Sequence, residues 1–208
     1  MKVLQIVSRV AEKIAPGRSP SFAEAHVIKA LEEIALQGSV GRMKLSRNLK
    51  LGEGETRTLI KHLKSEGLIE VSKSGISIST SGRKLLSGLR ASVSEAIEIP
   101  STPLTVGPLN VALRVRRAEE FIKCGLEQRD AAIMAGAKGA TTLVFTKNRL
   151  TMPGTMEDIS KNYPQILSSL SEVGLEEGDV VIIGSADELI KAELGAKTAA
   201  LELYKLMP

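Results

Sequence analysis

Basic side chains are concentrated between residues 42 and 73, at spacings that favour contact with a polyanion. In the segment ETRTLIKHLKSE (55–66), Arg57, Lys61 and Lys64 fall on one face of a predicted helix, because residues three or four apart share a face. Arginine can address guanine O6 and N7, whereas lysine is better suited to phosphate. The candidate DNA-binding residues are Arg42, Lys44, Arg47, Arg57, Thr58, Lys61, His62, Lys64, Lys73 and Ser74. His62 is expected to be an exposed helix residue.

The charge of the 208-residue chain is uneven along its length. Residues 1–100 hold 16 Lys/Arg against 10 Asp/Glu, a net +6, and residues 101–208 hold 12 against 14, a net −2. Residues 39–90 alone hold 11 against 4, a net +7. This asymmetry indicates that the first half faces a polyanion, the alternative being a solubilising surface. Aromatic residues make up only 2% of the chain, which argues against base stacking on single strands and favours duplex DNA as partner.

The elements that must position these cations follow the order of a winged helix-turn-helix. A helix preceded by a capping-box pattern, Ser21 with Glu24, leads to a short extended segment, a short helix, a turn and the cationic helix. Strands LIEV (68–71) and ISIS (76–79) form the predicted wing, and residues 81–97 a closing helix. Such a module places one helix in the major groove and its hairpin on the flanking backbone. Two acids in the first turn of the cationic helix, Glu53 and Glu55, suit the helix dipole but would lie near phosphates.

The first segment, MKVLQIVSRVAEKIAPG (1–17), is too short and too charged for a signal peptide and is predicted to be an amphipathic helix. Its apolar side needs cover, which makes it a candidate dimer element. The apolar residues on that side are Val3, Ile6, Val7, Val10 and Ile14.

Residues 22–86 resemble the winged-helix domains of prokaryotic regulators of the MarR-like and DtxR-like kind. The similarity is clearest in RTLIKHLKSEGLI (57–69) and GISISTSGRKLL (75–86). The whole chain resembles an archaeal family of such proteins whose C-terminal half is a domain of unknown function, through CGLEQRDAAIMAGAKGATTLVF (124–145) and GLEEGDVVIIGSADE (174–188). The resemblance implies DNA binding. The DtxR-like metal ligands do not carry over, because the His, Cys and Glu set is absent.

The proline-rich segment PSTPLTVGPLN (100–110) is predicted to be a linker between a winged-helix domain (1–99) and a second domain (111–208). The second domain has the pattern β-α-β-β-α-β-α, which predicts a layered α+β or α/β fold. Its expected elements are a strand at 110–115, a continuous helix at 117–136, a hairpin around Lys147-Asn148, a helix from about Glu157 after Thr155, a strand at 179–184 and a long helix at 186–207.

Two places in the second domain are candidate ligand sites. Gly184, Ser185 and Asp187 lie where a strand should end and a helix begin, and free N–H groups there suit an anion. The alternative is a plain helix cap made by Ser185 and Glu188. Arg129 falls on an apolar stripe of the predicted helix, where it needs an anionic partner. That partner is either a ligand or an internal carboxylate such as Asp130 or Asp187, unless a helix break at Gly125 shifts the stripe.

Nothing in the sequence forms a catalytic constellation. The single cysteine, Cys124, is expected to be a core residue, and no histidine is placed to activate it or a serine. With two histidines and one cysteine we expect no metal site or cofactor. No run of about 18 apolar residues occurs, so a cytoplasmic location is expected. The predicted function is a homodimeric DNA-binding transcription regulator whose second domain dimerises or senses a small anionic effector. The alternatives are a protein–protein interaction module and, less favoured, an enzyme.

Overall fold

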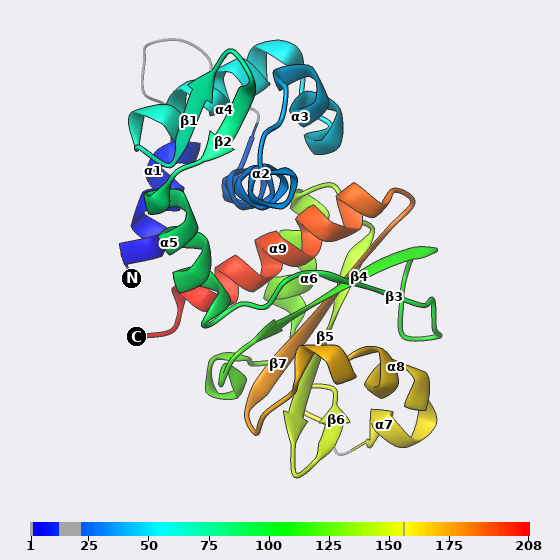
Figure 1. Ribbon diagram of the computed structural model, residues 1–208. Coiled ribbons are helices and arrows are strands. Elements are labelled where there is room, and N and C mark those ends of the chain that lie inside the picture. Colours follow the sequence, from blue (N-terminus) through cyan, green and yellow to red (C-terminus); the bar gives the residue numbers. More distant parts are fainter. Residues whose placement is uncertain (1, 13–21, 156) are drawn as a thin grey trace. The chain divides into compact units, whose positions relative to one another are not determined.

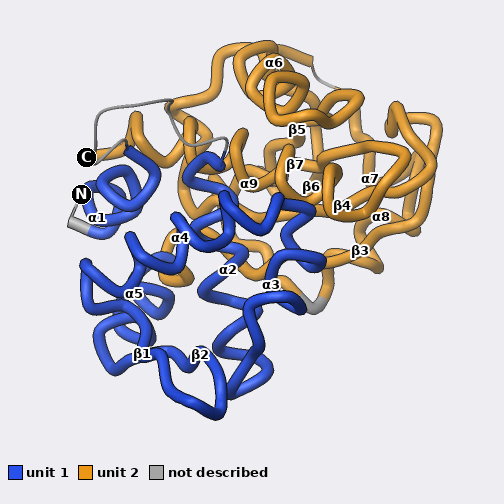
Figure 2. Tube along the Cα trace, turned by 90° about the horizontal axis from the view of Figure 1, so that it is seen from above, with its two compact units in different colours: residues 1–89 blue, residues 90–208 orange. Residues whose placement is uncertain are grey.

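The computed structural model describes residues 2–12, 22–155 and 157–208. The chain divides into two compact units, residues 1–89 and residues 90–208 (Figure 2). Each unit has its own secondary structure and core and is described by itself below.

The N-terminal unit has the element order of the predicted winged helix-turn-helix. Its elements are α1 (Lys2–Ala11), α2 (Glu24–Gln37), α3 (Arg42–Leu49), α4 (Glu53–Ser65), β1 (Ile69–Ser72), β2 (Gly75–Ile78) and α5 (Thr80–Arg90). Val40, between α2 and α3, exchanges two backbone hydrogen bonds of 2.9 Å with Ile76 of β2. This bridge attaches the β1–β2 hairpin to the helices, so the wing is held by backbone bonds as well as by its own turn.

Helix α1 packs against α2 and α4 within its own unit. Val7 and Val10 of α1 have no exposed surface. Val3 and Ile6 on the same side are only half-buried, so the unit covers part of this apolar side, and the role of the helix as a dimer element stays a prediction. Ile14 and Ser21, which the sequence placed on this helix and in a capping box, lie outside the described residues.

The C-terminal unit contains the predicted β-α-β-β-α-β-α succession, so the two-domain α+β fold class is confirmed. Its strands are β3 (Ile97–Ile99), β4 (Leu109–Val115), β5 (Gly139–Thr146), β6 (Arg149–Thr151) and β7 (Asp179–Ala186). Its α-helices are α6 (Leu126–Met134), α7 (Ile159–Asn162), α8 (Pro164–Ser169) and α9 (Leu189–Lys205), and two 3-10 turns, η1 (Glu119–Phe121) and η2 (Ser171–Val173), complete the unit.

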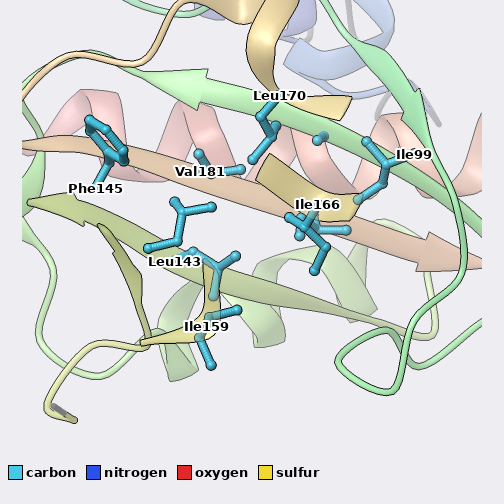
Figure 3. Packing of buried hydrophobic residues seen from close by; sticks show 10 residues of the cluster. Ile99, Leu143, Phe145, Ile159, Ile166, Leu170 and Val181 are labelled. Carbon is cyan, nitrogen blue, oxygen red and sulfur yellow. The ribbon is translucent and has the colours of Figure 1, made fainter. Parts of the chain in front are cut away.

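The five strands form one sheet in the order β3-β4-β7-β5-β6, with every neighbouring pair antiparallel. Strand β7 is central and pairs with β4 (Val111↔Gly184) and with β5 (Ala140↔Gly184). Helices α6 and α9 pack on each other and cover one face, while α7 and α8 lie on the other (Figure 1). On the α7–α8 face, Leu143, Phe145 and Val181 point toward Ile159, Ile166 and Leu170 and form the core shown in Figure 3.

The predicted domain boundary at residue 99 is wrong by about ten residues. The closing helix ends at Arg90 instead of continuing to residue 97, and β3 pairs with β4 through Ile97↔Ala112 and Ile99↔Asn110. The alternation in IEI (97–99) is a strand period, and the predicted closing helix overlapped it at Ile97. The predicted linker also overlaps the sheet, because β4 already begins at Leu109.

The continuous helix predicted over residues 117–136 is also wrong. Gly125 has φ +80°, a left-handed conformation that ends the helical geometry between η1 and α6. Cys124, just before this break, is exposed and not in the core. The hairpin around Lys147 and Asn148 is confirmed: both have positive φ, 50° and 58°, as a two-residue hairpin turn requires.

Candidate nucleic-acid interface

Helix α4 has a buried face and a cationic face. Leu59 and Leu63 have no exposed surface, whereas Arg57, Lys61 and Lys64 are exposed one above the other along the helix. The side chains buried with the leucines are Thr56 and His62. Because the apolar positions recur with the helical period, packing this stripe inward leaves the three cations on the outer surface.

The N-terminus of α4 is capped by its own first turn. The Gly52 N–H donates to Glu55 Oε2 at 3.1 Å, and the Thr56 hydroxyl donates to the Gly52 carbonyl at 3.0 Å. The Glu55 side chain thus turns back toward the N-terminus of α4, where its negative charge interacts favourably with the helix dipole. Glu53 remains exposed in the first turn. The Thr58 hydroxyl donates to the Gly54 carbonyl at 3.1 Å, so it can only accept from a further partner.

Helix α3 and the wing carry the other predicted cations. Arg42, Lys44 and Arg47 are exposed on α3, and Lys73 is exposed at the tip of the hairpin. In Figure 1, α3, α4 and the β1–β2 hairpin all lie on one side of α2. Within the described ranges, no carboxylate forms an ion pair with the seven cations Arg42, Lys44, Arg47, Arg57, Lys61, Lys64 and Lys73. Their charges are therefore not neutralised inside the unit.

The wing tip is shaped by serines. The Ser74 hydroxyl lies 2.7 Å from the Ser72 hydroxyl, and the Ser39 hydroxyl donates to the Ser74 carbonyl at 3.0 Å. Gly75 has φ +129°, and a Cβ there would lie 2.6 Å from Ser39 Oγ, so only glycine fits beneath the turn. Ser74 is accordingly a structural residue of the tip as well as an exposed one.

His62 does not lie on the cationic face, so its placement among exposed DNA-binding residues is wrong. Its side chain is 5% exposed, and its Nδ1 lies 2.8 Å from the Val10 carbonyl near the end of α1. A carbonyl oxygen can only accept, so Nδ1 carries the hydrogen. The ring also meets Phe22 edge-on, with centroids 5.9 Å apart. The docking of α1 onto α4 buries this residue, and helical periodicity within α4 could not reveal it.

Two exposed apolar side chains near the cations were missed from the sequence. Met43 on α3 and Val71 on β1 are about half exposed, at 51% and 46%. Met43 falls outside the helical period of Leu45 and Leu49, which was a sequence signal of its exposure. Val71 falls in the strand period of the buried Ile69 along β1, so no sequence signal indicated that it would be exposed.

The Gly184-Ser185-Asp187 site of the second unit is not a helix N-terminus. Strand β7 continues to Ala186, and α9 begins only at Leu189. Ser185 is fully buried and donates to Asn110 Oδ1 at 2.7 Å, so it does not cap α9. Gly184 is where α9 crosses the sheet, since a Cβ there would lie 2.7 Å from Ala196 N. Asp187 is exposed and pairs with Lys138 at 2.7 Å.

Arg129 is not buried in an apolar stripe. The break at Gly125 resets the phase of the helix, and the side chain is half exposed. Its Nε and Nη2 donate to Asp130 Oδ1 at 3.0 and 2.9 Å. The internal partner that the sequence offered as an alternative is therefore present.

Two different family models match the two units of the chain. Residues 27–93 match the family model described as the CggR N-terminal DNA-binding domain, which covers α2 to α5. Residues 106–203 match a domain of unknown function, DUF4443. No curated protein matches the sequence.

The chain is also similar to a solved structure, a hypothetical protein from Pyrococcus horikoshii OT3. The identity is 28% and the TM-score 0.74, over 90% of this chain and 95% of the other. No helix in the described part of the chain is long and apolar enough to cross a membrane. Residues 27–93 of the N-terminal unit are thus similar to a DNA-binding domain, and the seven cations described above lie within this matched segment.

Proposed function

We propose that this protein is a transcription regulator whose N-terminal unit binds duplex DNA, with α4 in the major groove and α3 and the wing against the backbone. The observation that carries this proposal is the set of seven exposed cations without ion pairs on α3, α4 and the wing. An α-helix fits the major groove of B-DNA, and a flanking hairpin reaches the adjacent phosphates. The likeness of residues 27–93 to a DNA-binding domain supports the same assignment.

Further features of the proposal follow from this binding mode. A single helix-turn-helix module reads a short half-site, which favours a homodimer. Three exposed apolar side chains on α6, Leu126, Ile133 and Met134, favour the C-terminal unit as the place where two copies meet. The likeness to the Pyrococcus horikoshii protein supports the archaeal family. We assign no enzymatic reaction: His26 and His62, the two histidines of the sequence, are both engaged at helix ends.

The salt dependence of DNA binding tests the proposal. If four to six of the seven cations of each protomer meet phosphates, the slope of log K against log salt is about −4 to −5 per protomer, from roughly −0.9 per contact. Replacing Lys64 with Gln should reduce the slope by about 0.9, whereas the control Lys161→Gln, on α7 of the other unit, should not change it. A slope near zero, or no binding at low salt, would refute the assignment.

Two further variants test the docking of α4. In this docking the exposed Arg57 would meet a base edge, so Arg57→Ala should cost about 1–3 kcal/mol and relax the sequence preference. Lys73→Ala, on the wing, should weaken binding to all sequences equally. Uniform losses in both variants would make Arg57 a phosphate contact and contradict this docking.

A second candidate is a winged helix that docks on another protein. The exposed Met43 and Val71 beside the cations favour it, since apolar side chains are the usual anchors of protein interfaces. Selection of bound fragments from genomic DNA discriminates between the two: enrichment of a common sequence supports the regulator, and its absence supports the docking module.

A further inference from the structure

A hollow of about 230 Å³ lies in the C-terminal unit at the N-terminal end of α6. Residues at the start of this helix, Cys124, Gly125 and Leu126, form one side, and Thr142 of β5 forms another. Arg129, one turn into α6, also lines it. A helix, a strand and the segment 152–155 thus converge on this one small space.

The start of α6 has no internal acceptor for its first N–H groups. Gly125 occupies the N-cap position and has no side chain to accept from the first turn. The first helical bond joins Arg129 N–H to the Gly125 carbonyl, at 3.1 Å. Among the described residues no atom accepts from the N–H groups of Leu126, Glu127 and Gln128. Such an uncapped end attracts a negative charge.

Thr142 provides an independent indication that a polar ligand belongs here. Its side chain is 6% exposed, and its hydroxyl has no hydrogen-bond partner among the described residues. A Cβ on Gly125 would lie 3.1 Å from Thr142 Oγ1, so this hydroxyl sits directly beside the uncapped helix end. An unpartnered buried hydroxyl costs stability, and native proteins keep few of them without a reason.

The charges around the hollow favour an anion. Nε and Nη2 of Arg129 donate to Asp130, which orients the guanidinium and leaves Nη1 as a donor for a ligand. Neither Asp130 nor Glu127 lines the hollow itself. The adjoining cavity is lined by three cations, Lys123, Lys147 and Arg149, and by two carboxylates, Glu119 and Glu177. Its lining is therefore only weakly positive, and Arg129 is the charged side chain that lines the hollow itself.

The volume of the adjoining cavity limits the size of the ligand. It holds about 570 Å³ and shares Met152, Pro153 and Thr155 with the hollow. Ile122 and Val144 supply apolar surface in it. This volume lies within the usual range of small-molecule sites, which combine apolar walls with a few converging polar groups.

We propose that the C-terminal unit binds a small metabolite that carries a phosphate or carboxylate group. The acid group occupies the hollow, where it accepts from the free N–H groups of α6 and from Arg129, with Thr142 beside it. The body of the ligand lies in the larger cavity against Ile122, Val144 and Met152. That this ligand controls DNA binding rests on the proposed function; the binding site itself does not.

The test uses the full-length protein labelled with ¹⁵N and three probes: inorganic phosphate, phenyl phosphate and benzoate. We expect saturable shifts of the Leu126, Glu127 and Gln128 amide signals, with sodium chloride at equal ionic strength as the reference. Phenyl phosphate should bind more tightly than inorganic phosphate, because its ring reaches the apolar walls. Comparison with benzoate shows whether the site prefers phosphate or carboxylate.

Two variants separate a binding site from a structural coincidence. Arg129→Met should weaken probe binding about tenfold or more, whereas Arg116→Met, which breaks an exposed pair with Glu176, should not change it. Thr142→Val keeps the shape and removes the unpartnered hydroxyl, so it should raise the melting temperature without probe and weaken the probe's effect.

Absence of a saturable shift at the α6 amides with all three probes would overturn the site, as would unchanged binding in both Arg129→Met and Thr142→Val. Shifts confined to the cations of α3 and α4 would also overturn it. Loss of DNA binding alone, with intact α6 shifts, would refute the proposed function and leave the site standing.

Discussion

His62 joins the first helix to the cationic helix, so its replacement should damage the N-terminal unit and not the DNA-contact surface directly. In His62→Ala, the Val10 carbonyl loses its 2.8 Å donor and Phe22 loses its edge-on neighbour. A buried acceptor left without a partner costs about 1–3 kcal/mol, and an aromatic pair contributes about 0.5–1.5 kcal/mol. With the cavity left by the ring, we expect the unit to lose about 3–5 kcal/mol of unfolding free energy.

The neighbouring residue provides a matched control. Lys61 is exposed on α4 and makes no ion pair within the described residues. Lys61→Ala should therefore change stability by no more than about 0.5 kcal/mol while it weakens DNA binding. Urea unfolding followed by circular dichroism measures the first quantity, and fluorescence anisotropy with duplex DNA measures the second.

A double-mutant cycle with Phe22→Leu sharpens the test. The coupling between Phe22 and His62 should be about 0.5–1.5 kcal/mol, since the two rings are in contact. If His62→Ala instead unfolds like the wild type and loses DNA affinity as Lys61→Ala does, His62 faces DNA and its burial under α1 is wrong.

Two further predictions concern a titrating group and a close packing contact. Burial lowers the pKa of His26 below its ordinary value of 6.5, and the Glu55 carboxylate raises it only in part, so the neutral imidazole that accepts the Ala23 N–H at 3.2 Å is favoured. As the pH falls, His26 takes up its proton at a higher pH in the unfolded chain than in the folded one. Its contribution to the unfolding free energy should therefore be complete above about pH 6.5 and decrease below it toward the folded pKa. His26→Gln keeps an acceptor without the titration and should flatten this decline in urea unfolding, and an unchanged pH dependence would assign it to other groups. Gly184→Ala should lower the melting temperature through a loss of about 1–3 kcal/mol or more, because its Cβ would meet the backbone of α9 at Ala192 and Ala196. Gly54→Ala has open space and should be neutral or stabilising by about 0.5–1 kcal/mol, and equal melting of both variants would contradict the close approach of α9 to β7.

Features that depend on local chain chemistry were predictable from the sequence. The helical period of Thr56, Leu59 and Leu63 turns Arg57, Lys61 and Lys64 outward whatever α4 packs against. The Lys147-Asn148 turn is a local event as well, set by a two-residue connection between strands. Charge distribution, winged-helix order and the layered pattern of the second unit all follow from such short-range signals.

Only the tertiary structure decided where long-range contacts override these signals. His62 lies on α4 between exposed cations in sequence, yet a helix 52 residues away covers it. Residues 97–99 form a strand by pairing with β4. Ser185 belongs to β7 because its backbone pairs with Asn110 of β4 and Gly139 of β5 on either side. The hollow at the start of α6 depends on Gly125, whose positive φ separates η1 from α6, and on Thr142, which lies beside Gly125 in the folded unit. The sequence left a break at Gly125 only as an alternative, and the position of Thr142 cannot be read from it. Periodicity determines which residues share a face, but the partner that buries a face lies far along the chain, and its position is a property of the whole fold.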